Sequence, residues 1–133
     1  MQDPNSKEAI LQRSSQEDPI IMYFVVRESL NMSVGKIAAQ CAHAAQILLL
    51  KYFNNNCNDP ILFEKWLNSS FRKVVLRADD KEFSKIKDQA TNIALVVDNG
   101  LTEVSPGTET VIGLLPIYKS QSPKYIKRLQ VLK

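Results

Sequence analysis

Apolar runs alternate with helical stripes along most of the chain. Residues 20–27 (IIMYFVVR) form a continuous apolar run rich in β-branched and aromatic side chains, which predicts a central strand covered on both faces. Between residues 35 and 53 the apolar positions recur at helical spacing, which predicts an amphipathic helix. Asn31 or Ser33 is the expected N-cap of this helix.

The rest of the chain continues this alternation. The pattern predicts strands at 73–78, 93–97 and 110–115, helices at 61–68, 80–91 and 122–129, and an extended end at 130–132. Asp79 is the expected cap of the helix at 80–91. Strands that alternate with helices imply an α/β sandwich with a mixed sheet. The segment 98–109 joins two strands without a helix, so this pair is expected to be antiparallel.

Composition indicates one globular domain. The 133 residues are 44% hydrophobic and 23% charged, and 17 Lys and Arg against 14 Asp and Glu give a net charge of +3. A disordered chain would have fewer apolar residues and a larger net charge. Residues 1–19 are polar and contain prolines, so we expect a flexible arm there, followed by a single domain at 20–133.

Cysteine usage and the length of the apolar runs predict a soluble, cytoplasmic protein. Cys41 and Cys57 do not have a metal-binding spacing, and a single His cannot complete a Cys/His zinc site, so no metal is expected. Residues 1–19 lack the pattern of a secretory signal. The longest apolar run, 20–26, is far shorter than the about 20 residues that span a bilayer. We therefore expect reduced thiols and no membrane partner.

The segment 33–45 (SVGKIAAQCAHAA) is the first candidate site. It follows a predicted buried strand and opens a helix, whose N-terminus offers free N–H groups and a positive dipole. Lys36 adds a full charge, and Gln40 and His43 share its helix face. Such a group suits a phosphate or a developing oxyanion. The alternative is an ordinary helix with a solvated Lys36 and with His43 packed at the helix–sheet seam.

The segment 98–110 is the second candidate site. Asp98 ends an apolar strand, and ligands bind at strand ends in open α/β sheets. One carboxylate with the hydroxyls of Thr102, Thr108 and Thr110 suits a bound water molecule. A plain turn-rich loop is the alternative, because Asp-Asn-Gly and Pro-Gly are also good turn sequences. Both candidate sites lie beside predicted strands, so they can meet at one edge of the sheet.

The tail of the chain is basic. Residues 119–133 contain several cations and no acid, and tyrosines are interleaved with them, which suits contacts with phosphates. The alternative is a solvated amphipathic helix. Residues 81–88 (KEFSKIKD) mix both charge signs and indicate a solvated helix face.

Four ordered blocks of the sequence resemble the peptidyl-tRNA hydrolase type 2 family over about residues 21–132. FVVRESLNMSVGKIAAQCAHAA is similar to the family pattern VVRxDLxMGKGKxAAQxxHAA, KVVLRADD to KVVLKxxD, and VVDNGLTEVSPGTETVIGLLP to IxDAGRTQxxPGTxTVLxxGP. The ending IKRLQVLK is like the family's terminal strand. The resemblance implies hydrolysis of the ester between a peptide and the 3′ end of tRNA, without metal or cofactor. It also implies a three-layer α/β/α sandwich with about four strands, often as a homodimer.

The resemblance also implies roles for individual residues. Asp98 would orient or deprotonate the attacking water, which Thr102 and Thr110 would hold. Lys36 would stabilise the oxyanion or anchor the terminal phosphate. The two candidate sites and the basic tail, rather than the family motif, supply the expected substrate contacts: Gln40, His43, Gly100, Thr108, Lys119 and Lys124.

Several positions depart from the family pattern. Gly, Lys, Ala, Arg and Gln of the pattern are replaced by Ser33, Val34, Asn99, Leu101 and Glu103. Two cations are lost and one acid is gained, and each lost phosphate contact weakens binding to RNA. The alternative function is therefore a non-catalytic or weakly catalytic module that binds RNA or protein. A small-molecule hydrolase or transferase is a third reading, because a fold alone does not fix a function.

Overall fold

A mixed β-sheet forms the centre of the computed structural model, which describes residues 18–100 and 103–133. The central strand β1 (Ile20–Arg27) pairs in parallel with β2 (Lys73–Ala78) and antiparallel with β4 (Glu109–Gly113). β3 (Ala94–Val97) lies outside β4, and the pair is antiparallel as predicted. β6 (Gln130–Val131) lies beside β2, and β5 (Ile117–Tyr118) pairs with the start of β1.

The described residues thus form a sheet of six strands in the order β3-β4-β1-β2-β6, with β5 on β1. The expected number of about four strands is not confirmed. The two additional strands, β5 and β6, have two residues each. Segments that short carry no alternation of apolar and polar side chains, so their pairing is visible only in three dimensions.

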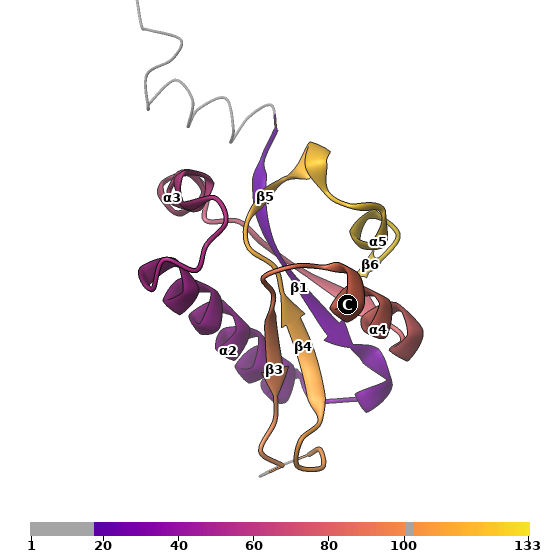
Figure 1. The fold of residues 1–133 in the computed structure, drawn as a ribbon. Helices are drawn as coiled ribbons and strands as arrows, with labels where there is room; N and C mark the ends of the chain where they lie inside the picture. Colours follow the sequence, from indigo (N-terminus) through magenta and orange to yellow (C-terminus); the bar gives the residue numbers. More distant parts are fainter. Residues whose placement is uncertain (1–17, 101–102) are drawn as a thin grey trace, which may run out of the picture.

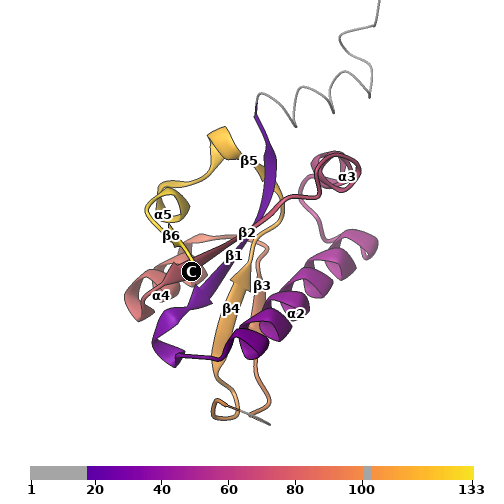
Figure 2. The same cartoon turned by 180° about the vertical axis from the view of Figure 1, so that it is seen from behind.

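Helices cover both faces of the sheet (Figures 1 and 2). α2 (Val34–Phe53) and α3 (Pro60–Asn68) lie on one side, and α4 (Asp80–Gln89) and α5 (Lys124–Lys127) lie on the other. Two short 3-10 turns, η1 (Glu28–Leu30) and η2 (Lys119–Gln121), follow β1 and β5.

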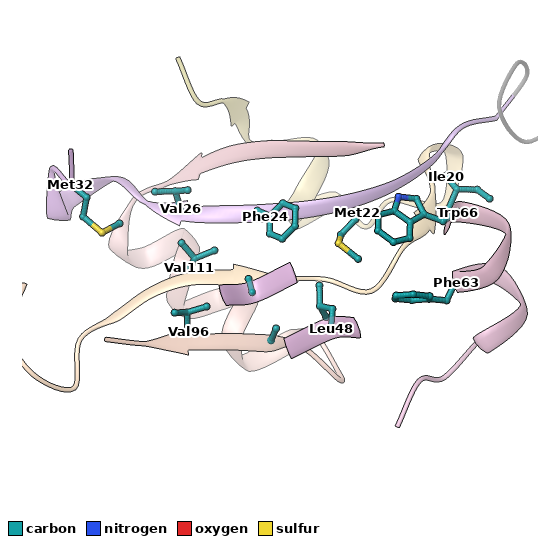
Figure 3. Packing of buried hydrophobic residues seen from close by; sticks show 12 residues of the cluster. Ile20, Met22, Phe24, Val26, Met32, Leu48, Phe63, Trp66, Val96 and Val111 are labelled. Carbon is teal, nitrogen blue, oxygen red and sulfur yellow. The ribbon is translucent and has the colours of Figure 1, made fainter. Parts of the chain in front are cut away.

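The apolar run of β1 supplies the core on both faces. Its alternate residues from Ile20 to Val26 pack with α2 and α3, where Leu48, Phe63 and Trp66 meet them (Figure 3). The intervening residues, such as Val25, pack with α4 and α5. Side chains of successive strand residues point to opposite faces. A strand that is apolar at every position is therefore the one that can sit between two helical layers.

The helices α2, α3 and α4 begin where the sequence supplies a capping side chain. The Ser33 hydroxyl accepts a hydrogen bond from the backbone of Lys36 and caps α2, as predicted. Asp79 caps α4 and forms a reciprocal capping box with Glu82. Asp59 caps α3, whose first residue is a proline. Each cap satisfies backbone N–H groups that have no partner inside the helix.

The last predicted helix is wrong in length. The segment 122–129 holds only the four residues of α5, Lys124–Lys127, which follow η2 and begin after Pro123. The backbone N–H of Ser122 closes the turn of η2 by donating to Lys119. A separate turn therefore precedes the proline, and the helix is confined to the residues behind it. None of the helices in the described part of the chain is both long and apolar enough to span a membrane.

Candidate active site

Lys36 and Asp98 form an ion pair at one edge of the sheet. Lys36 lies in the first turn of α2, and Asp98 directly follows β3. The Lys36 Nζ donates to Asp98 Oδ1 at 2.6 Å. The two side chains are only 11% and 9% exposed, so water screens their attraction less than it would at the surface.

The strand directions bring these two residues together. β1 and β3 are both antiparallel to β4, so both strands end at the same edge of the sheet. The chain leaves β1 through η1 and enters α2, while it leaves β3 at Asp98. Ligand sites in open α/β sheets lie at this kind of edge.

The loop after β3 holds the Asp98 carboxylate in place. The backbone N–H of Gly100 donates to Asp98 Oδ2 at 2.7 Å. The Asp98 backbone exchanges hydrogen bonds of 2.9 Å with Thr108 and Gly107, which closes the loop. Gly100 has φ +74°, and a Cβ there would lie 2.4 Å from the nitrogen of Pro106. Only glycine fits this position, because other residues strain at such a φ and would collide with Pro106.

The surroundings of Asp98 favour its charged form. The hydrogen bond from Lys36 is the largest cause that lowers the pKa of Asp98, and the Gly100 N–H lowers this pKa further. His43, which is exposed on α2, adds a smaller electrostatic contribution in the same direction. Asp98 is therefore a carboxylate at neutral pH, and it can accept a hydrogen bond from a water or hydroxyl group.

Gln40 and Thr110 form a buried polar contact behind the ion pair. Gln40 Nε2 donates to Thr110 Oγ1 at 2.7 Å, and this hydroxyl lies 3.4 Å from the Val96 carbonyl oxygen. The residues are 1% and 0% exposed, so they present no surface to a substrate. They link α2, which carries Lys36, to β4 and to β3, the strand that Asp98 directly follows.

Glu103 binds Ser33, the N-cap residue of α2. Its carboxylate accepts a hydrogen bond from the backbone N–H of Ser33 at 2.7 Å and another from the Ser33 hydroxyl. These two hydrogen bonds are the main causes that lower the pKa of Glu103. In the sequence, Glu103 stands out only as an added acid relative to the family pattern. Ser33 and Glu103 are 70 positions apart in the sequence, so no local residue spacing could predict their contact.

The other predicted site residues have different positions. The Thr108 hydroxyl donates to the Ser105 carbonyl at 2.6 Å within the loop. His43 is exposed, so the alternative in which it packs at the helix–sheet seam is wrong. Thr102 lies outside the described residues. Lys119 donates its backbone N–H to Pro19, at the start of β1, and Lys124 lies on α5. The structure does not bring these two lysines to the ion pair.

The described residues contain no group of three or more His, Cys, Asp or Glu side chains that could hold a metal ion. Both cysteines are free. Burial raises the pKa of the Cys41 thiol to about 11, so this thiol is protonated at neutral pH. A thiolate rather than a thiol is the reactive form of cysteine, so Cys41 is a structural residue.

Comparison with known proteins identifies the family. The model of the family "Peptidyl-tRNA hydrolase PTH2" matches residues 20–132, a range that includes every residue of the site above. The chain belongs to this family. It is 36% identical to peptidyl-tRNA hydrolase 2 of Saccharomyces cerevisiae over 107 residues, which cover 74% of this chain and 51% of the yeast protein.

Two further relatives from this family differ in length. The peptidyl-tRNA hydrolase of Thermoplasma acidophilum is 35% identical over 116 residues, which cover 84% of this chain and 97% of the archaeal protein. The mitochondrial peptidyl-tRNA hydrolase 2 of Homo sapiens is 34% identical over 119 residues, covering 86% of this chain and 63% of the human protein. The chain thus matches nearly all of the archaeal relative but only about half of the yeast one.

Proposed function

We propose that this protein hydrolyses the ester bond between a peptidyl or N-blocked aminoacyl group and the 3′ end of tRNA. The observation that carries the proposal is the ion pair of Lys36 and Asp98, 2.6 Å apart at the sheet edge, in a chain that belongs to the Peptidyl-tRNA hydrolase PTH2 family. The names of its yeast, archaeal and human relatives agree with this activity.

In the proposed mechanism, a water molecule attacks the ester carbonyl directly. Asp98 accepts a hydrogen bond from this water and orients it. Because the pKa of Asp98 is lowered, its carboxylate is a weak base, so it takes up the proton only as the new C–O bond forms. The tetrahedral intermediate then expels the 3′ oxygen of the tRNA, which receives the proton. The products are the free peptide and the free tRNA.

Lys36 supplies the positive charge for this reaction. Its ammonium group lies in the first turn of α2, where the helix dipole is also positive, and the contact with Asp98 fixes its position. A preorganised cation stabilises the developing oxyanion without having to reorganise during the reaction. The terminal phosphate of the tRNA is an alternative ligand for the same group.

Two predicted participants have separate roles in this proposal. Thr110 is buried and bound to Gln40, so both act as positioning residues that fix α2 against β3 and β4. We keep Thr102 as a residue that holds the water, a role that rests on its place in the family motif. His43, Gly100 and Thr108 remain proposed substrate contacts. Lys119 and Lys124, which do not lie at the ion pair, remain proposed contacts with tRNA phosphates.

The first test measures deacylation of an N-blocked aminoacyl-tRNA by the parent, Asp98→Asn and the charge-matched control Asp88→Asn. Asp88 is exposed on α4, so its substitution should leave turnover unchanged. Loss of an acid–base group of this kind lowers kcat by about 10²- to 10⁴-fold. Turnover by Asp98→Asn at the parental rate would overturn the role of Asp98.

The same assay tests Lys36 separately. Lys36→Ala should lower kcat by about 10²- to 10³-fold, the cost of removing one oxyanion donor. Lys51→Ala, in the last turn of α2, is the control. A parent that binds tRNA without hydrolysing the ester would instead be the binding module that the departures at Val34 and Glu103 suggested.

We also propose how the chain is organised. Helices on both faces of the sheet support the three-layer sandwich, and the family match over 20–132 supports a single domain. The arm proposed for residues 1–19 falls outside the described residues up to position 17. The carboxylate of Asp18 accepts hydrogen bonds from Ser120. A homodimer and a cytoplasmic location are proposals that rest on the family resemblance and on composition.

A further inference from the structure

The helices α4 and α5 lie on the face of the sheet opposite to α2 (Figures 1 and 2). Side chains of these two helices form a basic groove. Its cavity has a volume of about 260 Å³ and is lined by Lys81, Glu82, Lys85, Tyr125 and Arg128. The sequence suggested only a solvated helix face at 81–88 and a separate basic tail. The fold joins these two segments into one surface.

Helical spacing and core packing create this basic groove. Lys81 and Lys85 are four positions apart and share one face of α4. Tyr125 and Arg128 are three positions apart at α5. The two helices pack on the same face of the sheet through the cluster that contains Phe83, Ile86 and Ile126. The two rows of side chains therefore line the same cavity.

The cations of the groove have no acidic partner within the described part of the chain. The ion pairs found there use other cations, namely Arg27, Lys36, Arg77 and Lys87. Lys81, Lys85 and Arg128 are exposed and take part in none of them. These three groups are therefore available to an external anion.

The acids at the start of α4 are already engaged. Asp79 and Glu82 bind each other's backbone N–H groups in the capping box of α4. The Asp80 carboxylate accepts hydrogen bonds from Arg27 at 2.9 Å and from Ser29 at 2.5 Å. Engaged carboxylates compete weakly for the neighbouring lysines, so the surface attracts anions.

Tyr125 gives the groove an aromatic wall. The residue is half-buried, and burial raises the pKa of its phenol, so the ring stays neutral. A neutral ring beside cations is a surface on which a sugar or a base can pack while the cations bind phosphates. An anionic membrane would use the cations alone, without a walled groove. We therefore favour RNA as the partner.

One wall of the groove, α4, begins at the edge of the sheet where the candidate active site lies. α4 begins at this edge, because Asp80 contacts Arg27 and Ser29, at and just after the end of β1. α2, with Lys36, begins there too, on the other face. An RNA whose 3′ end lies at Lys36 and Asp98 can thus pass around this edge and reach Lys81, the first groove residue.

We propose that the α4–α5 groove binds backbone phosphates of the tRNA body while its 3′ end occupies the site at Lys36 and Asp98. This inference rests on the proposed function. It supplies cationic contacts in a chain that has Val34 and Leu101 at two positions where the family pattern has basic residues.

The test compares two double variants that each remove two positive charges. Lys85→Gln/Arg128→Gln removes groove cations, and Lys51→Gln/Arg72→Gln removes cations from the other side of the molecule. With full N-blocked aminoacyl-tRNA, the groove variant should raise KM about tenfold and leave kcat unchanged. Its slope of log affinity against log salt should become shallower by about 1.5, the loss of two phosphate contacts.

A short substrate separates the groove from the chemistry. An N-blocked aminoacyl ester of the trinucleotide CCA carries the reactive bond without the tRNA body. The groove variant should hydrolyse it with parental KM and kcat. Equal effects of both double variants on full tRNA would overturn the groove, because net charge alone would then explain them. A raised KM for the short substrate would also overturn it.

Binding of deacylated tRNA keeps this inference separate from the proposed function. If the parent hydrolyses neither substrate but the groove variant alone loses tRNA affinity, the groove stands and the hydrolase proposal fails. If the parent hydrolyses both substrates and the groove variant retains parental tRNA affinity, the hydrolase proposal stands and the groove fails.

Discussion

At the scale of single residues, the state of Asp98 decides what the site can do. Its carboxylate accepts from the Lys36 ammonium and from the Gly100 backbone, and both contacts favour its ionised form. A carboxylate held in this way orients a hydrogen-bond donor and does not readily carry a proton away. The chemistry therefore depends more on where the water is held than on a strong base.

The titration of Asp98 checks this account. In Lys36→Gln the largest cause of the lowered pKa is removed, so the pKa of Asp98 should rise toward its usual range. It should remain somewhat lowered, because the Gly100 contact persists. Carboxyl carbon chemical shifts followed by NMR against pH measure both values. Equal pKa values of Asp98 in parent and variant would contradict the assigned cause.

The same shift predicts how stability depends on pH. A carboxyl whose folded-state pKa is below its unfolded value stabilises the fold above the unfolded pKa. This contribution is lost as the pH falls through the folded-state pKa. The difference in unfolding free energy between the parent and Asp98→Asn should therefore shrink in strong acid. It should be constant between pH 6 and pH 8.

At the scale of elements, the contact of Gln40 with Thr110 fixes α2 against β4. Thr110→Val removes the hydroxyl and leaves the Gln40 amide buried without this partner, which costs about 1–3 kcal/mol of unfolding free energy. Gln40→Leu/Thr110→Val replaces both partners with apolar groups and should cost less than the sum of the single variants. Urea unfolding of the four proteins measures the coupling, and additive costs would contradict it.

Elements with a strong local pattern were predictable from sequence. The bounds of β1 and β2 are those predicted, because continuous apolar runs end at charged or turn residues. Ser33 and Asp79 cap their helices as expected, because capping depends on one side chain and the backbone beside it. Features that depend on tertiary contacts, such as β5, the burial of Thr110 and the bond between Ser33 and Glu103, were not predictable.

The candidate site was partly predictable for the same reason. The sequence indicated that Lys36 and Asp98 can meet at one sheet edge, since each lies beside a strand end. Strand order and pairing bring Lys36 and Asp98 into contact and place Lys119 away from this ion pair. No local sequence pattern specifies that order or pairing. Matching residues to the family motif supplied roles, but it did not reveal which of them are accessible to a substrate.

At the scale of the whole molecule, the position of α2 over the sheet links stability to the site. Gly113 of β4 lies under this helix, and a Cβ there would be 3.1 Å from the Ala44 Cβ and 3.0 Å from a Leu48 methyl group. Gly113→Ala should push α2 outward and cost about 1–3 kcal/mol of unfolding free energy, as overpacking does. Lys36 is part of α2, so movement of this helix should displace its ammonium group and lower kcat as well.

Thermal unfolding and the deacylation assay check this prediction together. Asp79→Ala is the matched control, because it removes the cap of α4 on the other face and costs about 1 kcal/mol. It should lower stability without lowering kcat. Parental kcat in Gly113→Ala, despite lower stability, would show that the site tolerates movement of α2.

The bond between Glu103 and Ser33 has a consequence for any anion that approaches α2. The N-terminus of this helix, which is its positive end and favours phosphate binding, already binds a carboxylate of the same chain. An incoming phosphate must therefore displace the Glu103 carboxylate before it can bind to the N-terminus of α2. Free phosphate and short anions make no further contacts with the protein, so they displace this carboxylate poorly. A long polyanion that is also bound elsewhere on the protein can displace the carboxylate. The Glu103 carboxylate therefore disfavours binding of small anions relative to a long polyanion.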